Sequence, residues 1–217
     1  IARYHRLLGE DVHFLTGTDE HGQKVQNAAE KRNIKPQEHC DEMVVHFQDL
    51  WKKLNICNDD FIRTTEQRHM VVVQHLLQKL WDAGEIYKDK YKGLYSVSEE
   101  RFITQAEFDE GDFREVKKIE EVNYFFKMSK YQQKLIDYID QNPGFVKPQS
   151  RENEVLGFLR QPLNDLCISR PKARLSWGIK LPFDPEYVTY VWFDALTNYI
   201  SAIGYPTEEE EFASLWP

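Results

Sequence analysis

The sequence contains few of the residues that hold small proteins together through metal ions or disulfides. Among its 217 residues there are three cysteines, Cys40, Cys57 and Cys167, and their spacing includes no CxxC pair. This pattern argues against a zinc knuckle and against a disulfide framework. We therefore expect the three cysteines to be small buried hydrophobic residues of a protein from a reducing compartment.

Long hydrophobic runs and an excess of positive charge are also missing. No segment approaches the ~18 consecutive apolar residues that indicate a membrane-spanning helix, so we expect no association with a membrane. The formal net charge is −8 at pH 7, so the overall charge does not indicate a nucleic-acid-binding protein. Residues 147–180 are a local exception, with seven Lys or Arg residues against three acidic ones. This region fits ordinary surface and an edge facing a polyanion equally well.

The segment Gly17-Thr-Asp-Glu-His-Gly-Gln-Lys24 has the pattern of a strand-to-helix turn. Residues 12–15 before it are apolar and typical of a strand, while residues 25–32 after it are rich in Ala, Glu and Lys, which favours a helix. In open α/β sheets, ligands bind outside the carboxyl ends of the strands, close to helix N-termini. Asp19, Glu20 and His21 fall in this turn and are candidate site residues. A plain loop in which Asp19 caps the helix has the same pattern.

The rest of the chain alternates between amphipathic helices and short strands. Hydrophobic residues that recur every three or four positions predict helices, and short β-branched runs predict strands. Thr64-Thr-Glu-Gln67 fits a capping box at the start of one helix. The helices are expected at residues 36–55, 64–84, 131–139, 151–159 and 194–203. Strands are expected at residues 60–64, 166–169 and 187–191, with an aromatic, β-rich insertion at 86–126.

The first motif becomes informative in combination with a second one near the end of the chain. The second motif is Tyr190-Val-Trp-Phe-Asp-Ala-Leu-Thr-Asn-Tyr199. It is preceded by Ile168-Ser-Arg-Pro-Lys172 and by Ser176-Trp-Gly-Ile179. Together with Gly17-Thr-Asp-Glu-His-Gly22, these motifs resemble those of bacterial or organellar methionyl-tRNA synthetases, which are class I aminoacyl-tRNA synthetases. The resemblance extends over essentially all 217 residues, with the motifs in the family's order.

The resemblance implies an α/β fold with a Rossmann-like parallel sheet that is interrupted by a small β-rich connective insertion. On this basis residues 1–86 form the first part of the catalytic domain, residues 87–126 the insertion, and residues 127–217 a helical segment and the return to the catalytic domain. The family's His-Ile-Gly-His motif would precede Ile1, and its Lys-Met-Ser-Lys-Ser motif would follow Pro217. We therefore expect an internal fragment of a catalytic domain, from the cytoplasm or an organellar matrix.

The resemblance also implies an enzyme that activates L-methionine with ATP and Mg²⁺ to methionyl-adenylate and then charges the 3′ end of tRNA(Met). Asp19 matches the family position that holds the amino group of the substrate, and it is therefore also a catalytic candidate. Trp192 and Tyr199 match positions that line the methionine pocket, and Leu196 lies between them where another branch of the family has Pro. The spacing of these three residues is also typical of core packing.

The candidates on the ATP side are fewer. Arg170 is the catalytic candidate for contact with the ATP phosphates, and a surface position or a structural ion pair is its alternative role. His21 and Gly22 are candidates for binding ATP, the co-substrate, and their alternative role is to build the turn.

Two further motifs of the family are altered or misplaced in this chain. Many members carry zinc knuckles in the insertion, but this chain reads Tyr95-Ser-Val-Ser-Glu99 where a Cys pair is expected. We therefore predict an insertion without zinc that is held together by aromatic packing. Lys127-Met-Ser-Lys130 matches four residues of the phosphate-binding signature, but it runs directly into an amphipathic helix without Gly or Ser hinges. We predict that it is not the signature.

Two functions of other classes fit parts of the sequence. The first is a metal-dependent hydrolase that uses Asp19, Glu20 and His21 as ligands, joined by His5 or His13. Three adjacent residues seldom converge on one ion, and the sequence offers no second cluster to complete the ligand set. The second is a non-catalytic relative that only binds a partner.

Overall fold

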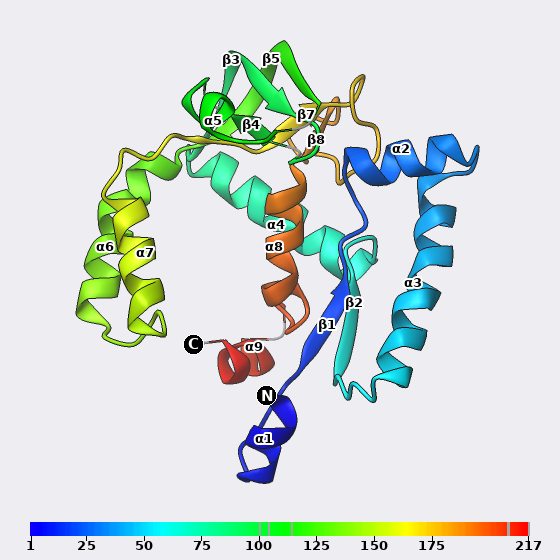
Figure 1. The fold of residues 1–217 in the computed structure, drawn as a ribbon, viewed down its shortest axis with the longest axis vertical. Coiled ribbons are helices and arrows are strands. Elements are labelled where there is room, and N and C mark those ends of the chain that lie inside the picture. The colour runs from blue at the N-terminus through cyan, green and yellow to red at the C-terminus, as the bar shows by residue number, and fades with distance from the viewer. Residues whose placement is uncertain (100, 104, 114, 208, 217) are drawn as a thin grey trace.

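Two parallel strands and their connecting helices form the first part of the molecule (Figure 1). The computed structural model describes residues 1–99, 101–103, 105–113, 115–207 and 209–216. Strand β1 (Leu15–Thr18) pairs in parallel with β2 (Asp60–Arg63), and helices α2 (Gln23–Lys31) and α3 (Pro36–Lys53) connect them. A short helix, α1 (Ala2–Leu7), precedes β1. The strand-turn-helix prediction is thus confirmed, but β1 lies three residues later than residues 12–15.

The register of the two strands explains this shift. Gly17 lies opposite Ile62, and a Cβ atom at position 17 would lie 2.0 Å from the Ile62 carbonyl oxygen. A residue with a side chain would therefore separate the strands, so the glycine belongs to the strand and not to the turn. The loop that carries the candidate residues begins only after Thr18.

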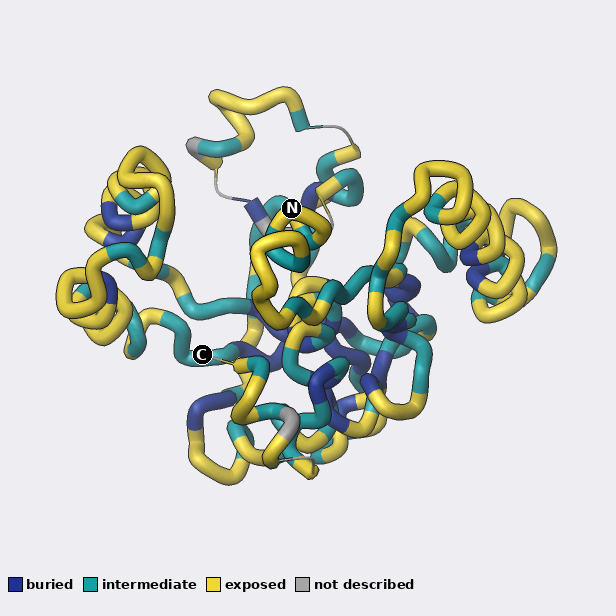
Figure 2. Tube along the Cα trace, turned by 90° about the horizontal axis from the view of Figure 1, so that it is seen from below, coloured by how far each residue is buried: buried dark blue, intermediate teal, exposed yellow. Residues whose placement is uncertain are grey.

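The hydrophobic core lies where helix α4 (Gln67–Asp82) crosses the middle of the molecule. Helix α4 packs against α8 (Val191–Ser201), and Val73 and Leu77 of α4 are fully buried. Their spacing of four residues places them on one face of the helix. The central cluster of buried residues consists of Val73, Leu77, Ile86, Tyr124, Ile168, Ile179 and Leu181. It joins α4 to the insertion and to the returning chain, and Figure 2 shows the buried residues gathered near the centre, between largely exposed helices.

The insertion is an antiparallel sheet at the top of Figure 1. Its strand order is β4-β3-β5-β6, with β3 (Ile86–Ser96), β4 (Arg101–Ile103), β5 (Val116–Phe126) and β6 (Leu166–Cys167), and the short helix α5 (Gln105–Glu110) lies between β4 and β5. Aromatic side chains contact one another along it, for example Tyr87 stacked on Phe125 with ring centroids 5.7 Å apart. The fourth strand comes from outside residues 87–126, because the chain returns to the sheet after the helical segment.

The helical segment and the return complete the fold. The 3-10 helix η1 (Met128–Tyr131) leads into α6 (Gln132–Gln141), which packs on α7 (Gln149–Leu159) around Ile139, Leu156 and Leu159. The chain then forms the antiparallel pair β7 (Ser169–Pro171) and β8 (Tyr187–Thr189), followed by α8 and α9 (Glu209–Leu215). No helix among the described residues has the length and apolar character needed to cross a membrane.

Candidate functional site

The turn between β1 and α2 is held in place by its own side chains. Glu20 is 4% exposed, and its carboxylate accepts hydrogen bonds from Thr18 Oγ1 (2.7 Å), Arg63 Nε (2.7 Å) and Thr65 Oγ1. Gly22, the N-cap residue of α2, has a φ of 105°, which a residue with a side chain rarely adopts. The turn is therefore fixed to the end of β2, and Glu20 is part of that attachment.

The turn borders a cavity that extends along β1. The cavity has a volume of about 260 Å³ and lies between the two parallel strands and helix α8. Its lining residues are Leu15, Thr16, Gly17, Thr18, Asp19, Ile62, Thr64, Ala195, Asn198 and Tyr199. The structure thus brings Asp19 from the first motif and Tyr199 from the second to one place. A carboxylate beside apolar and aromatic groups suits a ligand that has both a cationic and an apolar part.

Helix α8 presents its aromatic face outward. Trp192, Leu196 and Tyr199 are 52%, 60% and 57% exposed. The spacing of four and three residues places them on one face of the helix, while Val191, Asp194, Thr197 and Ser201 are buried on the other side. These three residues are therefore not core residues of the described structure. Trp192 and Leu196 continue the face of Tyr199 beyond the residues that line the cavity.

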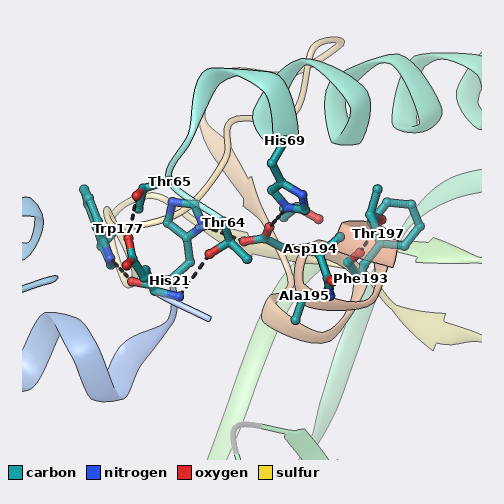
Figure 3. Close-up of polar contacts among 12 residues, drawn as sticks. His21, Thr64, Thr65, His69, Trp177, Phe193, Asp194, Ala195 and Thr197 are labelled. Atoms are coloured by element: carbon teal, nitrogen blue, oxygen red, sulfur yellow. Dashed lines mark hydrogen bonds and ion pairs between the residues drawn. The ribbon is translucent and has the colours of Figure 1, made fainter. Parts of the chain in front are cut away.

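A buried network that sequence reasoning missed connects the two motifs (Figure 3). Asp194 is fully buried, and its carboxylate lies 2.6 Å from His21 Nδ1 and 2.7 Å from His69 Nε2. His69 Nδ1 lies 2.8 Å from Ser201 Oγ. Burial alone would raise the pKa of Asp194, but the hydrogen bonds from both histidines outweigh it and hold the pKa below its ordinary value. The sequence contains one signal of this network, because Asp194 is the acidic residue in the otherwise apolar start of a helix, Val191-Trp-Phe-Asp-Ala-Leu196.

Trp177 fixes the turn from the other side. Its indole Nε1 donates a 2.6 Å hydrogen bond to the carbonyl oxygen of Glu20, and its ring centroid lies 5.2 Å from that of His21. Its own carbonyl accepts a hydrogen bond from the backbone N–H of Gly22 (3.4 Å). His21 and Gly22 therefore help to build the turn, whatever else they contact.

The comparisons with known proteins agree with this geometry. The family model for tRNA synthetases class I (M) matches residues 1–111 and 110–217. The chain belongs to the class I tRNA synthetases. Among curated proteins it is 50% identical to the methionine--tRNA ligase of Clostridium perfringens over 223 residues and 47% identical to that of Bacillus subtilis over 234 residues. Both alignments include all of this chain, which spans about a third of either relative (34% and 35%).

Solved structures of this class have the same fold. A crystal structure of Mycobacterium tuberculosis methionyl-tRNA synthetase bound by methionyl-adenylate matches with a TM-score of 0.91 and 41% identity. The apo form of that protein matches with a TM-score of 0.77 and 39% identity. Both matches cover the whole of this chain, and they cover 44% and 42% of the other chain. The Rossmann-like α/β fold expected from the sequence is confirmed.

Arg170 lies apart from the cavity that Asp19 lines. It is 2% exposed, and its Nη1 donates to the carbonyl oxygen of Ser169 (2.7 Å) and to Cys167 Sγ (3.2 Å). Its guanidinium carbon lies 4.7 Å from the ring centroid of Tyr190 and 5.1 Å from that of Tyr95. Arg170 lines a different cavity, between the insertion and the α6–α7 segment. These contacts favour a structural role over contact with phosphates, but the role involves a carbonyl oxygen, a thiol and aromatic rings in place of the expected ion pair.

The Lys127-Met-Ser-Lys130 segment forms the entry to a helix, as predicted. Lys127 Nζ donates to the Gly84 carbonyl oxygen (2.6 Å), and Lys130 Nζ pairs with Glu85 Oε1 (2.5 Å). Ser129 donates from its N–H and its hydroxyl to Asp165 Oδ1. These contacts attach the segment to the turn between α4 and β3 and to the loop before β6.

The carboxylates and histidines of the first motif do not form a metal site. Within the described parts of the chain, no group of three or more His, Cys, Asp and Glu residues could hold a metal ion. Glu20 is bonded to Arg63, His21 to Asp194, and His5 pairs with Glu10 at 2.6 Å. The metal-dependent hydrolase alternative therefore lacks its ligand set.

Proposed function

We propose that this chain is the methionine-binding part of a methionine--tRNA ligase, which activates L-methionine with ATP and charges the 3′ end of tRNA(Met). The observation that carries the proposal is the cavity along β1 that Asp19 and Tyr199 both line. The names of the relatives, methionine--tRNA ligase and methionyl-tRNA synthetase, support it. Because the relatives named above are bacterial, we also propose a cytoplasmic location.

In this proposal Asp19 binds the ammonium group of methionine. A charge-assisted hydrogen bond of this kind contributes roughly 1.5–3 kcal/mol. Tyr199, Leu196 and Trp192 contact the thioether side chain, and sulfur–aromatic contacts contribute about 0.3–1.5 kcal/mol each. The exposure of this face of α8 leaves its aromatic rings accessible to a ligand.

The ATP side involves fewer residues of this chain. We propose that His21 and Gly22 approach the nucleotide at the start of α2, where a helix N-terminus favours negative charge. Mg²⁺ would arrive bound to the phosphates of ATP, because Mg²⁺ prefers phosphate and water oxygens to an all-protein site. We propose no zinc in the insertion.

The reaction consists of two substitutions that depend on positioning. The methionine carboxylate attacks the α-phosphorus of ATP, the bond to the β-phosphate oxygen breaks, and pyrophosphate leaves. A ribose hydroxyl of the tRNA 3′ end then attacks the activated carbonyl, and AMP leaves. Such reactions are accelerated mainly by holding the reacting groups in line and by stabilising the developing charge, and not by covalent catalysis. The role of Asp19 is to orient the carboxylate of methionine by fixing its ammonium group.

The test is methionine-dependent pyrophosphate exchange in a protein of the relatives' length that carries this sequence. Asp19→Asn keeps the size of the side chain but removes its charge. The KM for methionine should therefore rise and kcat should fall. Asp49→Asn changes an exposed carboxylate on α3 that pairs with Lys52, and it should leave both constants unchanged. Equal effects of the two substitutions would remove Asp19 from the site.

A binding experiment separates the other classes of function. Calorimetry with a non-hydrolysable methionyl-adenylate mimic should show binding that does not require a divalent metal ion. A metal-dependent hydrolase would need the metal. A non-catalytic relative would bind a partner without pyrophosphate exchange.

A further inference from the structure

We propose that Asp194 is a positioning residue of the methionine site, which acts by holding the aromatic face of α8 and the Asp19 turn in a fixed relation. The inference rests on the function proposed above and extends it to Asp194, which is buried on the side of α8 away from the proposed binding face. It is carried by three buried hydrogen bonds among His21, His69, Asp194 and Ser201.

Asp194 lies on the opposite side of α8 from the proposed binding face. At about 100° per residue, it points roughly 140–160° away from Trp192, Leu196 and Tyr199. A rotation of α8 about its axis would therefore move the Asp194 carboxylate and the three binding side chains together. Whatever fixes Asp194 also fixes the direction in which the aromatic face points.

The two partners of Asp194 come from two separate elements (Figure 3). His21 follows Asp19 by two residues in the β1–α2 turn, and it is bonded to Asp194 Oδ2 at 2.6 Å. His69 belongs to the first turn of α4, and it is bonded to Asp194 Oδ1 at 2.7 Å. Both carboxylate oxygens are therefore used, one for each element. A contact with one element would permit rotation, whereas contacts with two define the orientation of the helix.

The network also dictates where the protons are. An ionised carboxylate only accepts hydrogen bonds, so His21 must carry a proton on Nδ1 and His69 must carry one on Nε2. The lowered pKa of Asp194 is consistent with the ionised form. The Ser201 hydroxyl supports His69 from its other ring nitrogen at 2.8 Å. The two histidines are thus held with different nitrogens toward the same carboxylate.

His69 offers a matched pair of substitutions, because Asn and Gln place an amide nitrogen at different ring positions. The amide nitrogen of Gln is as many bonds from Cα as Nε2 of His, and that of Asn is as many bonds away as Nδ1. His69→Gln therefore keeps a donor toward Asp194 and loses the contact with Ser201. His69→Asn does the reverse. A difference between these variants reports on the Asp194 contact and not on the loss of the imidazole.

The experiment measures methionine and ATP kinetics in pyrophosphate exchange, in a protein of the relatives' length that carries this sequence. Asp194→Asn and His69→Asn should each raise the methionine KM by about tenfold, equivalent to ~1.4 kcal/mol. His69→Asn leaves the contact between His21 and Asp194 in place, so it should change the ATP KM by less than about twofold. His69→Gln should stay close to the parent. Thr197→Val is the control, because Thr197 is buried on the same side of α8 but its hydroxyl bonds to the Phe193 carbonyl oxygen of the same helix.

A role limited to stability would lower the fraction of active enzyme and leave the methionine KM unchanged. That result in folded Asp194→Asn protein would overturn the inference, as would equal kinetics of the two His69 variants. If the parent protein itself shows no methionine-dependent exchange, the proposed function fails instead. Nitrogen-15 NMR of the labelled histidines in the parent protein gives a test that needs no variant. Protonation of His21 at Nε2 with Nδ1 free would contradict the network directly.

Discussion

Arg63 donates a 2.7 Å hydrogen bond from Nε to Glu20 Oε1, and this ion pair joins the ends of the two parallel strands. The same guanidinium reaches Asp41 Oδ1 of α3 at 2.6 Å. Glu20 immediately follows Asp19, so the position of the candidate ammonium ligand depends on a pair that itself binds no substrate. The two adjacent acidic residues therefore have different roles: Glu20 holds the turn in place, and Asp19 lines the cavity. Their adjacency in the sequence does not reveal this difference.

Glu20→Ala should destabilise the protein and impair activity only through the position of the turn. Arg63 keeps its pair with Asp41, but Arg63 Nε and the hydroxyls of Thr18 and Thr65 lose the buried acceptor that they share. We therefore expect a loss of ~3 kcal/mol in the free energy of unfolding. Lys52→Ala, which breaks the exposed pair with Asp49, should cost less than about 0.5 kcal/mol. Urea denaturation of the two variants measures the difference. Equal midpoints would show that Glu20 is not a structural anchor.

Trp192→Ala should weaken methionine binding without destabilising the fold. Its side chain is half exposed, so we expect the free energy of unfolding to change by less than about 1 kcal/mol. The methionine KM should rise, with a cost of up to ~3 kcal/mol by analogy with emptied apolar sites, and selectivity against amino acids of similar size should fall. Tyr138→Ala, a half-exposed aromatic residue of α6, is the control for both measurements. An unchanged KM and selectivity would remove Trp192 from the site.

Lys130→Ala should leave pyrophosphate exchange within a few-fold of the parent. Lys130 is paired with Glu85, between α4 and β3, so its loss affects the attachment of η1 and not the chemistry. A decrease of about a thousandfold, or ~4 kcal/mol of transition-state stabilisation, would identify the segment as the phosphate-binding signature after all.

The insertion should contain no zinc. Ser96, in the place of an expected cysteine, is fully buried, and its hydroxyl lies 3.0 Å from Ser98 Oγ and accepts a hydrogen bond from the Glu99 N–H. Elemental analysis of chelator-washed protein of the relatives' length should find no stoichiometric zinc. Close to one zinc per chain, lost together with activity, would refute this prediction.

The three cysteines should react at different rates. Cys57 is exposed, contrary to the expectation of three buried cysteines, and hydrogen bonding to Arg3 together with the charges of Arg3 and Arg6 lowers its pKa. Burial raises the pKa of Cys40 to about 12 and also raises that of Cys167. Because the thiolate is the reactive form, iodoacetamide at pH 8 should modify Cys57 first, as peptide mass spectrometry can show. Labelling of Cys40 at the same rate in folded protein would contradict the structure.

The positions of most helices and the two site motifs were predictable from the sequence. The apolar spacing along α4, with Val73 and Leu77 on one face, is a local property because the period of a helix does not depend on its partners. The family resemblance also implied that Asp19 and Tyr199 belong to one site, and both line the same cavity. The limits of the insertion at residues 87–126 remain a proposal, because its sheet also contains β6, which belongs to the returning part of the chain.

Contacts between distant residues were decided only by the tertiary structure. Thr64 and Thr65 fit a capping box, yet α4 begins at Gln67 without a side-chain cap, and both hydroxyls bond to Glu20 instead. The start of β1 was misplaced because its register is set by pairing with β2. Asp194 and His21 are 173 positions apart. Local patterns specify helices and turns, whereas a buried carboxylate finds its hydrogen-bond donors only when the chain has packed.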